Sequence, residues 1–236
     1  MKEKGKTLVL TDNIHAYKLA LELERLHGGV DVYQSPSGSL EGVPRLHVRV
    51  QTPMIISTYD LVLSIHCKQM FPPELVSGVR CVNVHPGMNP YNRGWFPQVF
   101  SIINGLPSGV TIHEIDNELD HGPIIVQKEY KIQSWDTSGS AYAKIMAVEK
   151  ELVLEHFTAI RDQTYKVVSP KGEGNINYKK DFDRLKHIDL NQKGTFGEFI
   201  DRLRALTHGD FRNAYFIDSS GVKVFVRISL ELEDSQ

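Results

Sequence analysis

The sequence predicts an open, mostly parallel α/β sheet followed by a small α+β segment. Near the start, the apolar run Thr7–Thr11 precedes a helical stripe of leucines and then a second β-rich run, Val30–Gln34. This strand–helix–strand order favours parallel pairing with right-handed crossovers. Near the end, Ala214–Asp218 and Val222–Leu230 flank a Ser-Ser-Gly turn, which is typical of a β-hairpin.

The other elements follow from apolar spacing and turn residues. Leu19, Leu23 and Leu26 share one face of a helix over residues 14–27, which Gly28-Gly29 ends. Further strands are expected at Leu61–Ile65 and Cys81–His85, and helices at Glu74–Ser77, Phe96–Asn104, Ser138–Arg161 and Phe196–Leu206. The Pro- and Gly-containing stretch Lys166–Lys180 is expected to be a linker. We therefore divide the chain into a large domain, residues 1–165, and a C-terminal linker, helix and hairpin, residues 166–236.

Composition excludes several classes of protein. The chain has 236 residues, with 27 basic and 29 acidic side chains, so its net charge of −2 gives no general attraction for nucleic acid. Charged residues at 24% and hydrophobic residues at 41% are ordinary globular values. No apolar stretch suits a signal peptide or a membrane helix, and the two cysteines suit a reducing compartment. We expect a cytoplasmic protein.

The first turn after a strand argues against a dinucleotide-binding domain. Such domains carry a G-x-G-x-x-G turn, which lets the backbone approach a pyrophosphate. Here the turn is Thr11-Asp12-Asn13-Ile14-His15 and contains no glycine. Asp12 or Asn13 is better read as a helix cap.

Polar side chains that could perform chemistry lie near residue 85. In the strand Cys81–His85, Asn83 and His85 point to the same face, because side chains alternate along a strand. They stand near its carboxyl end, where open α/β sheets place their sites. The alternative is that Asn83 holds a loop and His85 is a core histidine. Asp120, in Asp120-His121-Gly122-Pro123, taken alone reads as a turn residue.

Together these segments resemble a known family. The pattern consists of Asn83-x-His85-Pro86, Pro90, Arg93-Gly94, Gly109-Val110-Thr111-x-His113 and Asp120-x-Gly122-Pro123-Ile124-Ile125. It resembles the formyltransferase family over residues 1–165. The resemblance implies the Rossmann-like formyltransferase fold, 10-formyltetrahydrofolate as formyl donor, and a catalytic set of Asn83, His85 and Asp120.

The chemistry of formyl transfer suits this set. An amine attacking a formyl group forms a tetrahedral intermediate, whose oxyanion a side-chain amide such as that of Asn83 can stabilise by ~3 kcal/mol. His85 is the expected general base, since an imidazole with an ordinary pKa of ~6.5 exchanges protons near neutrality. Asp120 would orient and charge-stabilise His85. His113 is expected to support rather than react, and the reaction requires no metal and no covalent nucleophile.

The resemblance also implies where the two substrates bind. The pterin of the donor is expected between two segments, at Leu63, Ile65, His66, Cys67, Lys68, Ile115, Asp116, Glu118 and Asp120. The loop after His85 differs from that of many relatives and, with the tail, is similar to bacterial sugar N-formyltransferases, notably those acting on dTDP-4-amino-4,6-dideoxyglucose for O-antigen or lipopolysaccharide synthesis. The expected nucleotide-sugar contacts are Asn89, Tyr91, Asn92, Arg93, Trp95, Tyr178 and Lys179.

Other assignments stay open at this point. The chain could formylate glycinamide ribonucleotide, hydrolyse formyltetrahydrofolate, or bind a folate or nucleotide sugar without catalysis. A metal site built on His66, His85 and His113 has spacings that match no familiar ligand motif. The tail strands are expected to pair across a homodimer, because edge strands seek partners.

Overall fold

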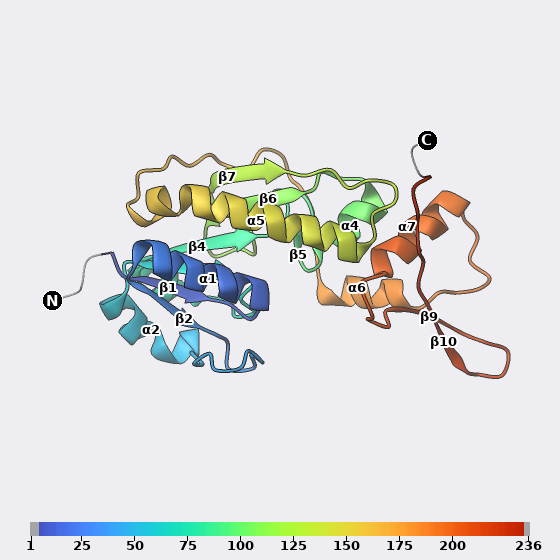
Figure 1. The fold of residues 1–236 in the computed structure, drawn as a ribbon, viewed down its shortest axis with the longest axis horizontal. Helices are drawn as coiled ribbons and strands as arrows, with labels where there is room; N and C mark the ends of the chain where they lie inside the picture. The colour runs from blue at the N-terminus through green and yellow to red at the C-terminus, as the bar shows by residue number, and fades with distance from the viewer. Residues whose placement is uncertain (1–4, 234–236) are drawn as a thin grey trace. The chain divides into compact units, whose positions relative to one another are not determined.

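The computed structural model describes residues 5–233, and the chain forms two compact units that interleave along the sequence (Figure 1). Unit 1 comprises Met1–His85, Val110–Lys128 and Met146–Lys171. Unit 2 comprises Pro86–Gly109, Glu129–Ile145 and Gly172–Gln236. The chain passes from unit 1 to unit 2 for the last time after Lys171, near the expected boundary at residue 165. Residues 86–109 and 129–145, which were expected in the first domain, belong to unit 2.

Unit 1 is built on a sheet with strand order β2-β1-β3-β4-β6-β7. The strands are β1 Thr7–Leu10, β2 Val30–Tyr33, β3 Leu61–Ile65, β4 Arg80–His85, β6 Gly109–Glu114 and β7 Ile124–Glu129. Strands β2, β1, β3 and β4 pair in parallel, and β6 is antiparallel to β4. The helices are α1 Ile14–His27, α2 Val48–Thr58, α3 Pro73–Gly78 and α5 Ser138–Arg161, the last of which continues from unit 2. The mostly parallel α/β sheet is confirmed.

Apolar burial holds these elements together. Every residue of β1 and β3 is buried, as expected for central parallel strands covered on both faces. Helix α1 buries Ala16, Leu19, Ala20 and Leu23 on one side. Its cap is Asn13, whose Oδ1 accepts hydrogen bonds from the backbone N–H groups of His15 at 2.8 Å and Ala16 at 3.2 Å. A cap of this kind stabilises a helix by ~1 kcal/mol. Here the cap binds backbone N–H groups at the helix N-terminus, which in a dinucleotide-binding fold bind phosphate.

Unit 2 has its own core. Its elements are β5 Arg93–Gly94, α4 Pro97–Asn104, β8 Ile176–Asn177, α6 Lys179–Lys186, α7 Phe196–Leu206, β9 Ala214–Ile217 and β10 Lys223–Val226. Val99 and Phe100 of α4 pack with Phe182 of α6 and Leu206 of α7. Strands β9 and β10 form the antiparallel hairpin expected from the sequence. The Asp218 carboxylate fixes its turn by accepting the N–H groups of Ser220 and Val222, each at 2.9 Å.

Sequence analysis does not predict four of the elements. Helix α2 contains Pro53 and many β-branched residues, which disfavour helices in isolation, so tertiary packing of Ile55 and Thr52 decides its structure. The expected linker Lys166–Lys180 contains β8 and the start of α6. Strand β5 is only two residues long and exists because β8 pairs with it in parallel. Between residues 5 and 233, no helix is long and apolar enough to cross a membrane.

Candidate active site

Strand β4 presents Asn83 and His85 from one face, near its carboxyl end. The antiparallel register sets Asn83 opposite His113 of β6, and His85 opposite Thr111. His85 is 3% exposed and His113 is 1% exposed, so both imidazoles are screened from bulk water. Fixed side chains on neighbouring strands give a more rigid site than loop residues would.

Asp120 joins this pair through both of its carboxylate oxygens. Its Oδ1 accepts a hydrogen bond from Asn83 Nδ2 at 2.9 Å, and its Oδ2 lies 3.3 Å from His85 Nδ1. The residue has a φ of 48°, in the left-handed region where Asp is one of the better tolerated side chains. The structure therefore brings together Asn83, His85 and Asp120, residues that are up to 37 positions apart in sequence.

The turn that carries Asp120 is held by a close backbone approach. A side-chain carbon added at Gly122 would collide with the carbonyl oxygen of Glu114 and approach the N–H of Asp116 to 3.4 Å. Beside it, the N–H of Glu114 donates to the carbonyl of Pro123 at 2.9 Å. Only glycine fits at position 122, so the Gly in the Asp-x-Gly-Pro sequence is what lets the turn close against β6.

The tautomer of His113 follows from its contacts. Its Nδ1 lies 2.8 Å from the carbonyl oxygen of Glu114, which can only accept, so Nδ1 carries the hydrogen. In the neutral ring, Nε2 is then an acceptor, and it lies 3.3 Å from Asn83 Nδ2. Both N–H groups of the Asn83 amide are thus directed, one to Asp120 and one to His113.

The first segment expected to hold the pterin divides into core and loop. Leu63 and Ile65 are fully buried strand residues that pair with neighbouring strands, which favours a core role over contact with a ligand. His66 has a φ of 54°, and its Nε2 lies 2.9 Å from the buried Glu149 of α5. Burial alone would lower the pKa of His66, but the charge and hydrogen bond of Glu149 outweigh it and raise that pKa above its ordinary value.

The two thiols are poor nucleophiles here. Burial raises the pKa of Cys81 to about 12 and also raises that of Cys67. Since the thiolate is the reactive form, both side chains stay protonated near neutrality. Cys67 Sγ instead lies 3.7 Å from Ser35 Oγ, and the next residue, Lys68, donates its backbone N–H to Asp12 at 2.9 Å.

The second expected segment, residues 115–120, is fastened by its own side chains. Ile115 donates its N–H to the carbonyl of Cys81 at 2.8 Å. The Asp116 carboxylate accepts the N–H of Glu118 at 2.9 Å and lies 2.7 Å from His121 Nδ1. This loop therefore presents an ordered backbone, which is what recognition of a flat heterocycle by hydrogen bonds requires.

In unit 2, the Asn92 amide joins two distant segments. Its Oδ1 accepts from Asn104 and Asn175, each at 2.8 Å, and from Asn177 at 3.1 Å. Its Nδ2 donates to Ser101 at 3.0 Å. Asn92 is 1% exposed, so these hydrogen bonds favour a role in holding the loop over direct contact with a substrate.

The remaining expected substrate residues flank this cluster. Asn89 is buried before a cis bond to Pro90, and Tyr91 and Arg93 are partly exposed. Trp95 is 39% exposed, and Lys179 Nζ lies 5.9 Å from the centre of its ring. Tyr178 is 47% exposed and begins helix α6. Pairing of β5 with β8 thus brings residues 93–95 beside residues 176–179.

Known proteins match both parts of the chain. Residues 51–157 match the formyl transferase profile, and residues 181–232 match the N-formyltransferase dimerization C-terminal domain. The dTDP-4-amino-4,6-dideoxyglucose formyltransferase of Mycobacterium tuberculosis is 66% identical over 226 residues, which cover 96% of this chain and 97% of the relative. This chain belongs to the formyltransferase family. The family resemblance, the fold and the class of enzyme expected from the sequence are confirmed.

Solved structures agree with this membership. A sugar N-formyltransferase from Shewanella sp. has a TM-score of 0.93 and 39% identity to this formyltransferase, covering 97% of this chain and 99% of that one. Formyltransferase PseJ from Anoxybacillus kamchatkensis, solved with UDP-4,6-dideoxy-4-formamido-L-AltNAc and tetrahydrofolate, has a TM-score of 0.62 and 25% identity, over 76% of this chain and 88% of that one.

Sequence reasoning missed two groups at this formyltransferase site. Glu149 lies in the middle of a long helix pattern, and nothing in its spacing signals that it faces His66. The sequence indicates Asp12 or Asn13 as the helix cap; in the structure Asn13 caps the helix, and Asp12 accepts hydrogen bonds from two other loops. Among residues 5–233, no three His, Cys, Asp or Glu side chains are grouped so that they could hold a metal ion.

Proposed function

We propose that this protein transfers a formyl group from 10-formyltetrahydrofolate to the amine of dTDP-4-amino-4,6-dideoxyglucose. One observation carries the proposal: the Asn83, His85 and Asp120 cluster stands in a chain 66% identical, over nearly its whole length, to an enzyme of that name. Acyl transfer to an amine requires a base that takes the amine proton and a hydrogen-bond donor that stabilises the oxyanion, and this buried cluster contains both, with a carboxylate beside the base.

His85 acts as the general base in this proposal. The Asp120 carboxylate, 3.3 Å from Nδ1, accepts the Nδ1–H and so favours the tautomer whose Nε2 is basic. As the amine nitrogen bonds to the formyl carbon, Nε2 takes the proton that the nitrogen loses. The nearby negative charge of Asp120 stabilises the imidazolium that forms, and the proton can then pass to the departing folate nitrogen.

Asn83 stabilises the oxyanion in this proposal. Its amide has two N–H groups, and the contact with Asp120 at 2.9 Å is shorter than that with His113 at 3.3 Å. The N–H directed to His113 is therefore the one that turns to the negative oxygen of the tetrahedral intermediate. An anionic acceptor forms a stronger hydrogen bond than a neutral imidazole, so the exchange favours the transition state.

Two ordered loops would receive the formyl donor. Residues 66–68 and 115–120 are fixed by contacts with Glu149, Asp12 and Cys81, and they retain the assignment of pterin-binding segments. The paired β5 and β8 segments of unit 2, with Arg93, Trp95, Tyr178 and Lys179, remain the proposed contacts of the nucleotide sugar. PseJ was solved with tetrahydrofolate and a formylated nucleotide sugar, which supports these two classes of ligand.

We further propose a cytoplasmic homodimer that supplies formylated sugars for O-antigen or a related glycan. The match of residues 181–232 to a dimerization domain supports the dimer. That region also exposes large apolar side chains, with Phe196 at 88% and Phe211 at 67%. The free thiols Cys67 and Cys81 suit a reducing compartment.

Mass spectrometry tests the proposed activity. Purified protein is incubated with 10-formyltetrahydrofolate and dTDP-4-amino-4,6-dideoxyglucose, and the nucleotide sugar is examined for a gain of the mass of CO. A gain that requires protein and donor supports the proposal. An unchanged sugar with intact donor refutes the acceptor assignment, and consumption of donor without any amine present identifies a hydrolase.

A further inference from the structure

Unit 1 contains a buried ion pair that the proposed formyl transfer does not use. His66 Nε2 lies 2.9 Å from a carboxylate oxygen of Glu149, and the side chains of the two residues are 14% and 2% exposed. Although burial alone would lower the pKa of His66, the charge and hydrogen bond of Glu149 raise it, so the pair favours its charged form. Removing two charges from water offsets much of their attraction, and stability alone is therefore a weak explanation for such a pair.

The backbone at His66 adopts a conformation that few side chains tolerate. Its φ is 54°, in the left-handed region, which costs free energy for residues other than glycine, although histidine is found there more often than most. A conformation of this kind persists only where its surroundings hold it. Here Glu149 binds the ring, and the N–H of Asp12 donates to the His66 carbonyl at 3.3 Å. Both the side chain and the main chain of His66 are therefore fixed.

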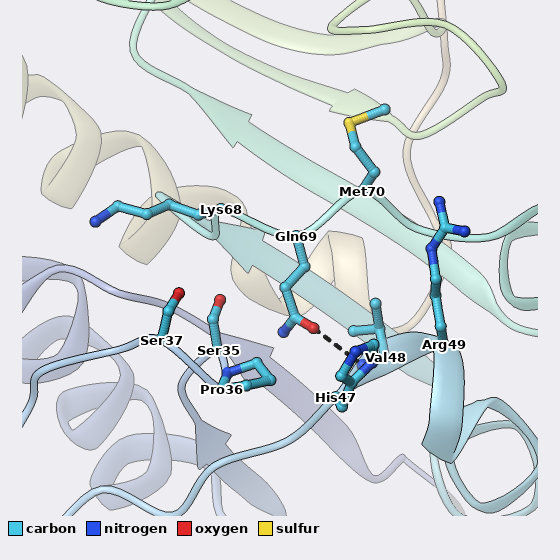
Figure 2. A pocket seen from close by; sticks show the side chains of 9 residues that line it. All are labelled: Ser35, Pro36, Ser37, His47, Val48, Arg49, Lys68, Gln69 and Met70. Atoms are coloured by element: carbon cyan, nitrogen blue, oxygen red, sulfur yellow. Dashed lines mark hydrogen bonds between the residues drawn. The ribbon is translucent and has the colours of Figure 1, made fainter.

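His66 begins a loop that is anchored again further along. The N–H of Lys68 donates to an Asp12 carboxylate oxygen at 2.9 Å. The next side chain, Gln69, accepts the N–H of Val48 at 3.0 Å. Figure 2 shows Lys68 and Gln69 on the chain that follows β3, with this last hydrogen bond as a dashed line. The contact with Glu149 thus fixes the first residue of a short, anchored segment.

The sheet register places this loop beside the strand that carries the proposed base. Strands β3 and β4 pair in parallel, with Ile65 opposite Val84. The residues that follow, His66 and His85, therefore stand at the same level of the sheet. Because neighbouring strands lie ~4.7–4.9 Å apart, a formyl donor that reaches His85 passes close to the main chain that follows β3.

We propose that Glu149 is a positioning residue for the formyl donor, a proposal that rests on the proposed function. Glu149 fixes the ring of His66 and thereby holds the main chain of residues 66–68 in the conformation that receives the pterin. Ordering a loop at the moment of binding costs affinity, so a loop that is already in place binds more tightly. Loss of the pair therefore weakens binding of the donor and leaves the chemical step at His85 largely unchanged.

Calorimetric titration of the full-length protein tests the proposal, with 5-formyltetrahydrofolate as the donor probe and dTDP as the acceptor probe. Glu149→Gln keeps the size of the side chain and removes its charge. We expect it to weaken binding of the donor probe roughly 3–30-fold, with the affinity for dTDP unchanged. In steady-state kinetics, the KM for 10-formyltetrahydrofolate should rise by a similar factor, while kcat at saturating donor stays near that of the wild type.

The matched control is Glu151→Gln. Glu151 is an exposed carboxylate of the same helix, and it pairs with Lys128. We expect this control to bind both probes as the wild type does.

A second variant approaches the pair from the loop. His66→Asn suits the left-handed backbone but removes the imidazole, so it should weaken the donor probe as Glu149→Gln does. The double variant should bind no more weakly than either single one, because both changes remove the same interaction. If Glu149→Gln does not fold, His66→Asn decides by the same two titrations.

Three results would overturn the proposal: wild-type affinity of Glu149→Gln for the donor probe, equal weakening of both probes, or additive losses in the double variant. In each case the proposed function would stand if the wild type formylates the sugar. A wild type that neither binds the donor probe nor formylates the sugar would refute both.

Discussion

Asn83 and His113 face each other across β4 and β6, with Asn83 Nδ2 lying 3.3 Å from His113 Nε2. On the other side of the ring, His113 Nδ1 lies 2.8 Å from the carbonyl oxygen of Glu114, which can only accept a hydrogen bond. In the tautomer with the hydrogen on Nδ1, the lone pair of Nε2 faces Asn83. Through this contact His113 can orient the amide that is proposed to stabilise the oxyanion. In the proposed mechanism His113 would act through Asn83, as a positioning residue.

Replacing His113 with phenylalanine tests this role. His113→Phe keeps the ring volume in a fully buried position but removes the acceptor. We expect kcat to fall roughly tenfold, about 1.4 kcal/mol of barrier, with little change in KM for either substrate, because the Asn83 amide can then rotate out of line before its N–H passes from His113 to the oxyanion. His113→Gln, which restores a polar partner, should recover part of the loss. A phenylalanine variant with the wild-type kcat would show that the contact is only structural packing.

Asp120 provides a second test, since its charge is required by the proposed base. Asp120→Asn keeps the shape of the side chain but loses the negative charge that stabilises imidazolium. We expect kcat to fall by ~10²–10⁴-fold while substrate binding persists. Asp162→Asn is the control, because Asp162 is an exposed carboxylate of the same unit that lies outside the proposed site and pairs with Arg161. Steady-state kinetics should show a wild-type kcat for this control and a large loss for Asp120→Asn.

Sequence analysis predicts the central sheet because its signals are local. The buried runs of β1 and β3, the Asn13 cap and the Ser-Ser-Gly hairpin each depend on a few neighbouring residues. Sequence analysis does not predict helix α2 or the short strands β5 and β8, because these elements form only through contacts with distant segments.

The same distinction applies to the site. Alternation along one strand places Asn83 and His85 on a common face, and the spacing of family motifs adds Asp120. Neither rule reveals that Glu149 reaches His66, or that Asn92 faces Asn175 and Asn177 rather than solvent. Those partners lie 83 to 85 residues apart, and only the folded chain brings them together.

The turn at Gly122 gives a stability prediction. Gly122→Ala would force a carbon against the backbone carbonyl of Glu114, which cannot yield as a side chain could. We expect a loss of ~1–3 kcal/mol in the free energy of unfolding, together with reduced kcat as Asp120 moves. Gly197→Ala is the control, since its new carbon meets only Thr195 Oγ1 at 3.8 Å. Urea denaturation should show no loss for that variant, and equal destabilisation of both would contradict the argument.

The pair of His66 and Glu149 predicts a dependence of stability on pH. Because the pKa of His66 is raised in the folded protein, its contribution is complete below the unfolded pKa of ~6.5 and is lost as pH rises through the folded value. His66→Asn removes the pair while tolerating the left-handed backbone. The difference in unfolding free energy between wild type and variant should therefore be larger near pH ~6 than near pH ~9.

The matched control for this experiment is Val50→Asn, at an exposed position of α2 that carries no titratable group. Its difference from wild type should stay nearly constant over the same pH interval. A His66→Asn difference that is flat, or that grows with rising pH, would contradict an ion pair formed by protonated His66.

The exposed aromatic residues of unit 2 predict which side chains hold the proposed dimer together. Phe196 and Phe211 lie in the region that matches a dimerization domain and are 88% and 67% exposed in the single chain. Burying such side chains against a partner stabilises association by ~1.5–3 kcal/mol each. We expect Phe196→Ser combined with Phe211→Ser to raise the dimer dissociation constant by at least ~100-fold, as measured by light scattering over a dilution series. Val50→Ser is the control, because Val50 is 73% exposed but belongs to α2 of unit 1. If the double variant stays as dimeric as this control, the aromatic residues do not form the interface.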